Sequence, residues 1–84
     1  MTTDDARQTW AIRSTGDVGR TIADLRARRG LTQEELARQG GISRNYLAQL
    51  ETGLTVAMVD RVLRLLRRLD AEVTVSVRTP ADDV

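Results

Sequence analysis

The sequence predicts an all-α domain of four short helices with a short β-strand near each end. Apolar residues recur at helical spacing in four stretches, each of which opens or closes with a helix-capping signal. Residues 71–78 instead alternate strictly between apolar and polar side chains, as a half-buried strand does. A chain of 84 residues has room for one domain. The predicted helices span residues 17–29, 33–40, 44–51 and 56–70.

The first strand and the first helix are predicted between residues 7 and 29. Trp10 and Ile12 lie on one side of a weakly alternating stretch, which indicates a short strand. The following helix carries an apolar residue on every turn and ends before Gly30. Trp10 is the single tryptophan, and two roles are open: an anchor for a partner protein, or a cover for the local core or a dimer sheet.

The second and third helices have clear start signals. Thr32 followed by Glu35 forms a capping box, in which each residue satisfies a backbone donor of the other. The second helix is expected to end at Gly40. Ser43 is placed to cap the third helix, and Gly53 to end it in a left-handed conformation.

The fourth helix is more apolar than a surface helix requires. Thr55 is its predicted N-cap, and its apolar residues fill about half of the helical wheel, whereas a one-sided surface helix needs roughly 100°. This surplus predicts a second packing partner and favours a dimer. The opposite face carries Arg61, Arg64, Arg67 and Arg68. These arginines form either a solvated face or a phosphate-binding stripe.

The C-terminal strand presents Val73, Val75 and Val77 on one face and is assigned to dimerisation. A lone strand leaves its backbone groups unpaired, so it needs a partner. That partner is residues 9–13, the same strand of a second copy, or both. The predicted organisation is an arm over residues 1–15, a DNA-binding domain over 16–70, a dimerisation strand over 71–78 and a disordered tail over 79–84.

Composition narrows the range of functions. The chain has no Cys and no His, which excludes disulfides, Cys/His zinc sites and His-based catalysis. With only carboxylates, Ser and Tyr left and no acid pair at an evident cleft, we expect no enzyme, cofactor or metal. All 13 basic residues are Arg, and acids gather at the ends, so the middle of the chain permits phosphate binding. Without a membrane-length apolar run or a signal-like N-terminus, a cytoplasmic location with no membrane contact is expected.

The glycine pair Gly40–Gly41 separates two short helices. A chain that reverses within about three residues needs a positive φ, which Gly adopts most readily. Ala37 stands four residues before Gly41, where close helix crossing requires a small side chain. A short helix, a tight turn and a second short helix indicate a helix-turn-helix.

The stretch RARRGLTQEELARQGGISRNYLAQLETG, residues 26–53, resembles the helix-turn-helix domain of the Xre family, the lambda-Cro-like and 434-repressor-like regulators. The resemblance covers residues 17–70. The resemblance implies a lambda-repressor-like fold and a homodimeric repressor of a near-palindromic operator in double-stranded DNA. The terminal strand is similar to that of HipB-like antitoxins, in which it pairs across a homodimer. This implies an antitoxin that neutralises a HipA-like toxin kinase and represses their shared operon.

Two alternatives differ in partner: a stand-alone regulator without a toxin, and a protein-interaction module on the same fold. The tail TPADDV has no aromatic residue that could insert into a toxin, which is a departure from the antitoxin pattern.

The candidate DNA-reading residues lie on the third helix. With Leu47 and Leu50 facing inward, the helical wheel turns Arg44, Asn45 and Gln49 outward, and these residue types can read guanine or adenine in the major groove. The resemblance places the base-reading positions on the same three residues. The resemblance also implies DNA-backbone contacts from Gln33 and Thr52, and a structural ion pair between Arg26 and Glu51. Thr32 opens the second helix, where backbone amides and the helix dipole favour a phosphate, and together with Ser43 it completes the predicted DNA-binding set. Tyr46 lies at the edge of this face, either contacting DNA or packing over the neighbouring turn.

Overall fold

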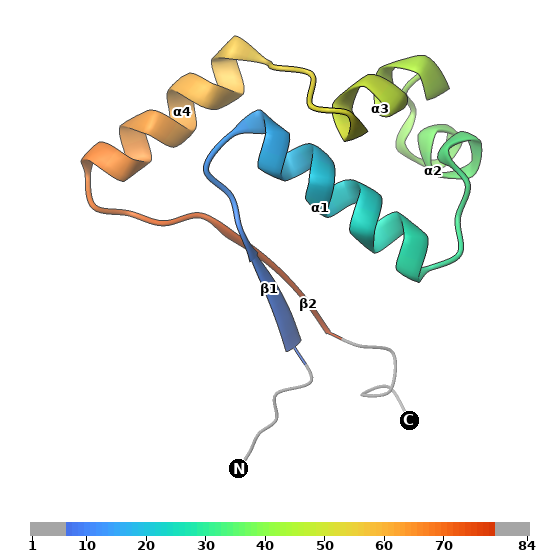
Figure 1. Cartoon of the computed structure of the whole chain (residues 1–84), viewed down its shortest axis with the longest axis horizontal. Coiled ribbons are helices and arrows are strands. Elements are labelled where there is room, and N and C mark those ends of the chain that lie inside the picture. The colour runs from blue at the N-terminus through green and yellow to red at the C-terminus, as the bar shows by residue number, and fades with distance from the viewer. Residues whose placement is uncertain (1–6, 79–84) are drawn as a thin grey trace.

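The computed structural model describes residues 7–78, in which four helices follow one another along the chain between two short strands (Figure 1). Helix α1 runs through the middle of the molecule, with α2 and α3 toward one end and α4 on the other side. The elements are β1 (Arg7–Ala11), α1 (Thr15–Arg28), α2 (Gln33–Gly40), α3 (Arg44–Glu51), α4 (Ala57–Arg68) and β2 (Thr74–Arg78). The predicted fold class is therefore confirmed. The predictions for residues 1–6 and for the tail 79–84 lie outside the described residues.

Helix α1 begins two residues earlier than predicted because Ser14 caps it. The Ser14 hydroxyl accepts a hydrogen bond from the Asp17 backbone N–H at 3.3 Å. The Asp17 carboxylate in turn accepts one from the Arg13 N–H at 2.7 Å. These two bonds fix the direction in which the chain enters the helix.

Strands β1 and β2 pair with each other in an antiparallel, two-stranded sheet. Trp10 stands opposite Val75, and the Ile12 N–H donates to the Val73 carbonyl at 2.9 Å just beyond the strand end. The predicted N-terminal strand is therefore the partner of the C-terminal one within the chain. Among residues 7–78, each strand has one neighbour and one outer edge.

Trp10 fastens the sheet to α1. Its indole N–H donates to an Asp24 carboxylate oxygen at 3.1 Å, and the Arg28 guanidinium lies over its ring at 5.4 Å from the centroid. Arg28 also pairs with Asp24 at 3.5 Å and donates to the Gln8 side chain. Of the two roles open for Trp10, covering its own chain is the one this geometry supports.

Helix α4 is not capped by Thr55, and this prediction is wrong. The N-cap is Val56, which offers no side-chain hydrogen bond. Thr15, from the start of α1, performs this role instead: its hydroxyl accepts from the Val56 N–H at 3.2 Å and donates to Asp60 Oδ1 at 2.7 Å. The Thr15 backbone N–H donates to the same oxygen at 2.7 Å and holds the pKa of Asp60 below its ordinary value. A cap supplied from 41 residues away leaves no local sequence signal.

The core is small and the molecule is thin. The Cα atoms span 39 × 36 × 18 Å, so few side chains can be enclosed on all sides. The buried apolar side chains are Ile12, Ala37, Leu47 and Leu63. The surplus apolar face predicted for α4 is present at its surface, where Met58, Val62, Leu65 and Leu69 are 66, 47, 64 and 75% exposed.

Candidate nucleic-acid interface

The turn between α2 and α3 depends on one of its two glycines. Gly41 adopts φ 72° and ψ 26°, the left-handed conformation, directly after the last residue of α2. The N–H of Ile42 then donates to the Ala37 carbonyl at 3.0 Å and closes the helix end. Gly40 is still helical, and a Cβ at this position would meet nothing within 4 Å. The glycine requirement inferred from the pair therefore falls on Gly41.

Helix α3 is fixed at its start and along its inner face. The Ser43 hydroxyl accepts from the Tyr46 N–H at 3.0 Å, as the sequence predicts for its cap. Leu47 is 2% exposed and anchors the helix in the core. Ala37 on α2 is equally buried, which lets the two short helices cross closely.

The outer face of α3 is polar and exposed. Arg44, Asn45 and Gln49 are all exposed, whereas Ala48 beside them is half-buried. Tyr46, which follows Asn45, is 41% exposed. Arginine and the two amides carry paired donors or a donor and an acceptor, which is the chemistry that matches base edges in the major groove.

Glu51 joins three helices at the end of α3. Its carboxylate receives two hydrogen bonds from Arg26 of α1, at 2.7 and 3.0 Å, and one from the Gln33 side chain of α2 at 2.9 Å. The hydrogen bonds from Arg26, and to a smaller extent the one from Gln33, lower the pKa of Glu51 from its ordinary value of 4.5. Burial acts in the opposite direction but does not cancel them. Arg26 also donates to the Leu31 carbonyl at 2.8 Å, which secures the turn before α2.

Gln33 is therefore held in place by a hydrogen bond within the protein. One N–H of its side-chain amide is engaged with Glu51. The second N–H of that amide can still donate to a phosphate oxygen, and its carbonyl oxygen can accept from a bridging water. Glu51 thus sets the position of a side chain for which the sequence predicts a DNA-backbone contact.

The two threonines in the candidate set make hydrogen bonds within their own helices. The Thr32 hydroxyl accepts from the Glu35 N–H at 3.0 Å, and the Glu35 carboxylate accepts from the Thr32 N–H at 2.8 Å, so the predicted capping box is confirmed. The Thr52 hydroxyl donates to the Gln49 carbonyl at 3.0 Å. Both threonines are exposed, at opposite ends of the helix-turn-helix.

Gly19 is a residue of the site's framework that the sequence reasoning missed. A Cβ at this position would lie 1.8 Å from the Leu50 carbonyl oxygen, so α1 and α3 can approach only over a glycine. A glycine inside a helix costs about 1 kcal/mol against Ala, which is the same signal that points to Gly40 and Gly41. It could have identified Gly19 as well.

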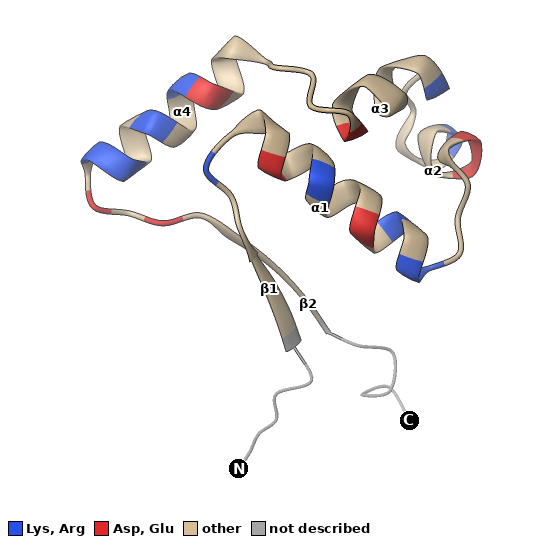
Figure 2. Ribbon diagram, in the orientation of Figure 1, with Lys and Arg blue, Asp and Glu red and all other residues tan. Residues whose placement is uncertain are grey.

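Charge is distributed unevenly over the helices (Figure 2). Arginines follow one another along α4, where Asp60 is the single acid, whereas α3 carries Arg44 at its start and Glu51 at its end. Among residues 7–78 there is no His/Cys/Asp/Glu cluster that could hold a metal ion. The same part of the chain contains no helix long and apolar enough to cross a membrane.

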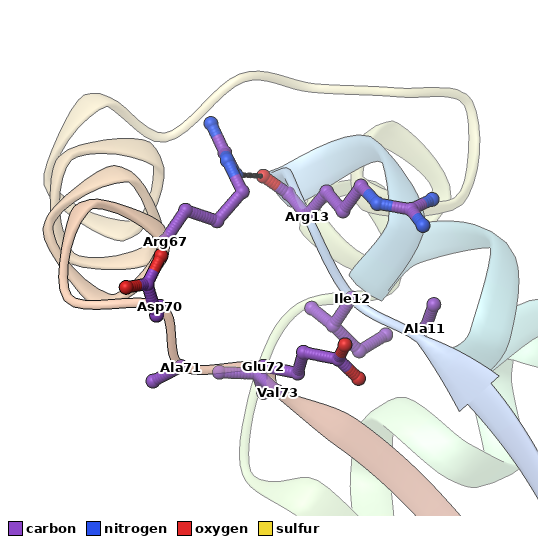
Figure 3. A pocket seen from close by; sticks show the side chains of 8 residues that line it. All are labelled: Ala11, Ile12, Arg13, Arg67, Asp70, Ala71, Glu72 and Val73. Carbon is purple, nitrogen blue, oxygen red and sulfur yellow. Dashed lines mark hydrogen bonds between the residues drawn. The ribbon is translucent and has the colours of Figure 1, made fainter.

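A cavity of about 350 Å³ lies away from the helix-turn-helix, between the end of α4 and the chain that leaves β1 (Figure 3). Arg67 spans it and donates to the Arg13 carbonyl at 2.6 Å, which fixes the end of α4. Asp70 on its rim has a φ of 61°, the left-handed conformation that ends that helix. The cavity thus separates α4 from the sheet without contributing to the α3 face.

Comparison with known proteins matches this chain to helix-turn-helix proteins. The family model described as Helix-turn-helix matches residues 22–75. An uncharacterised HTH-type transcriptional regulator of Sinorhizobium fredii, y4dJ, is 38% identical over 66 residues, which cover 79% of this chain and 84% of the relative. A second uncharacterised HTH-type transcriptional regulator of Sinorhizobium fredii, y4mF, is 28% identical over 64 residues, which cover 76% of this chain and 84% of the relative. No solved structure gives a significant match.

Proposed function

The chain belongs to the helix-turn-helix family of DNA-binding transcriptional regulators, and on this premise we propose that it is a homodimeric repressor that reads its operator through α3. The observation that carries the proposal is the exposed set Arg44, Asn45 and Gln49 on a helix that Ser43 caps and Leu47 anchors. Arg44 pairs with guanine, and the two amides pair with adenine. Gln33, Thr32, Tyr46 and Thr52 border this face and contact the DNA backbone.

The homodimer forms through the outer edge of β2. Because Ile12 donates to Val73, the residues at 73, 75 and 77 hydrogen-bond to β1, and Thr74 and Ser76 turn their backbone groups to the outer edge. An edge of this kind pairs with another strand. Two copies related by a two-fold axis would join their β2 strands into a four-stranded sheet, with Val73, Val75 and Val77 on a common face.

The finer proposal is that this repressor is an antitoxin of the HipB-like kind. It would repress the operon that encodes it and neutralise a kinase-type toxin. The strand after the last helix supports this assignment through the resemblance described above. A stand-alone regulator would have the same α3 face and no toxin. Co-purification of the native protein with a kinase encoded by the adjacent gene distinguishes the two, and the absence of such a gene excludes the antitoxin.

Replacement of Arg44 tests the reading role of α3. Binding sites are first selected from random double-stranded DNA, and affinities are measured by fluorescence anisotropy. Arg44→Ala should weaken binding to the selected site by about 1–3 kcal/mol and relax base preference at one position. The matched control is Arg64→Ala, which removes the same charge from α4 and should leave base preference unchanged. An Arg44→Ala protein with wild-type affinity and preference would show that α3 does not read the bases.

A further inference from the structure

The exposed apolar residues of α4 form a single seam. They are Met58, Val62, Leu65 and the C-cap residue Leu69. They are separated by four, three and four residues, which is the alternating spacing of the two apolar positions in a heptad. Such spacing aligns the side chains along one edge of the helix. A seam of this shape fits another helix lying along it.

The residues beside the seam differ in kind on its two sides. Val59 and Leu66 border it on the side that faces the protein and are half-buried. Arg61 and Arg68 border it on the solvent side, at equivalent heptad positions, and both are exposed. None of the ion pairs among residues 7–78 involves these two arginines. The seam therefore has a cationic flank without a counter-charge from the described part of the chain.

We propose that this seam binds an amphipathic helix of a second protein whose flank carries carboxylates. In paired helices the residues flanking the apolar seam determine which partner and which orientation are accepted. A helix with Glu or Asp beside its own apolar seam would place those carboxylates against Arg61 and Arg68 and its apolar residues against Leu65 and Leu69. This inference concerns a protein partner and is independent of DNA reading by α3.

A second copy of α4 fits the seam less well. In an antiparallel pair equivalent flanks meet, so Arg61 of one copy would approach Arg68 of the other. In a parallel pair each arginine would lie against Val59 or Leu66. Neither arrangement supplies a carboxylate from the helix, because its one acid, Asp60, is bound to Thr15. The sequence alone favours a second copy, whereas the positions of the arginines favour an acidic helix.

Two synthetic peptides test the proposal on the full chain. Each has three heptads with Leu at the seam positions; one carries Glu on both flanks and the other carries Lys. At about 50 mM salt, we expect the Glu peptide to bind at least about tenfold more tightly, with the difference shrinking as salt screens the charges. Amide chemical shifts should change along α4 and not along α3.

Variants identify the contacts. The double substitution Leu65→Gln and Leu69→Gln replaces two exposed residues, so the fold should persist by circular dichroism while binding of the Glu peptide is lost. Arg61→Glu with Arg68→Glu should reverse the preference toward the Lys peptide. The control Arg64→Glu makes the same substitution at one position away from the seam, with half the change in net charge, and should keep the original order of affinities.

Three results would overturn the proposal. The two peptides could bind equally or not at all. The Leu65→Gln, Leu69→Gln protein could lose self-association in sedimentation experiments, which would assign the seam to a second copy. The Arg61→Glu, Arg68→Glu protein could lose operator binding with its peptide preference unchanged, which would assign the arginines to DNA. Operator binding measured with Arg44→Ala decides the proposed function separately.

Discussion

Gly40 and Gly41 are adjacent in sequence but have different backbone requirements. Gly41 is left-handed at φ 72°, where a side chain is strained, whereas Gly40 is helical with open space around its missing Cβ. The helical position gains from a residue with a higher helix propensity. The two sites therefore permit opposite responses to the same substitution.

Gly40→Ala should raise the free energy of unfolding by about 0.5–1 kcal/mol, because Ala reduces the entropy of the unfolded chain and fits the helix. Gly41→Ala should lower it by about 1 kcal/mol or more, because Ala disfavours positive φ. Urea unfolding followed by circular dichroism measures both. If Gly40→Ala and Gly41→Ala changed the free energy of unfolding equally and in the same direction, the turn would not need a left-handed residue at position 41.

Glu51 makes stability depend on pH. Its pKa is lowered in the folded protein by hydrogen bonds from Arg26 and Gln33, so the carboxylate stabilises the fold above its unfolded pKa of about 4.5. That contribution should disappear as the pH falls through the lower, folded pKa. Glu51→Gln should lower the free energy of unfolding by about 3 kcal/mol at pH 7, because it leaves Arg26 without its counter-charge. The variant should also lose less stability than the wild type as the pH falls below 4.5. If the loss of stability at low pH were unchanged in Glu51→Gln, other carboxylates would be its cause.

At the scale of single elements, α4 shows how one helix start depends on another. Thr15 and Asp60 join the first turns of α1 and α4, and Thr15 is only 2% exposed. Its hydroxyl serves both Val56 and Asp60, so the two helices are held at a common point.

Thr15→Val should therefore destabilise the protein, because the methyl group that replaces the hydroxyl can neither accept from Val56 nor donate to Asp60. We expect Tm to fall by roughly 5 °C. Thr55→Val is the matched control, and it should leave Tm nearly unchanged because Thr55 does not cap the helix. Thermal unfolding of both variants checks this. If the control cost as much as Thr15→Val, local capping by Thr55 would matter after all.

The elements also show what local sequence can predict. The starts of α2 and α3 were predictable because Thr32, Glu35 and Ser43 lie within three residues of the amides they bind. The Thr15 cap is not predictable in this way, since Val56 and Asp60 are distant in sequence. A glycine inside a helix marks Gly19 as unusual, but the local sequence does not show that it packs against the Leu50 carbonyl. The same limit applies to the candidate site. The outward set on α3 follows from helical spacing, but the hydrogen bond from Gln33 to Glu51 exists only when α2 and α3 have packed.

At the scale of the whole molecule, thinness favours assembly. With an extent of 18 Å in its shortest direction, the chain encloses little apolar volume, and small domains often gain stability from a second copy. The proposed β2–β2 pairing would also set two α3 helices at a fixed separation. The operator should then be near-palindromic, with half-site centres about 34–36 Å apart or a multiple of this.

Ser76→Pro tests this pairing with little effect on the monomer. The Ser76 N–H faces the outer edge of β2, so proline removes a donor that β1 does not use. We expect dimers to dissociate in sedimentation experiments and binding to the full operator to weaken, while binding to a single half-site persists. Val75→Pro removes an N–H used by β1 and should instead disrupt the sheet. A Ser76→Pro protein that remains fully dimeric would place the dimer interface elsewhere.

The pairing of Arg7 with Arg78 has a consequence for the order of folding. Contacts between residues far apart in sequence tend to form after local ones, because closing a longer loop costs more conformational entropy. The helices can therefore assemble before the two strands meet, and the sheet should open before the helices when the protein unfolds. Both chain ends leave the sheet at the same end, so tension applied to the termini would separate the strands one pair at a time. A newly made chain would thus fold the proposed DNA-reading face of α3 before it forms the strand edge through which we propose that it dimerises.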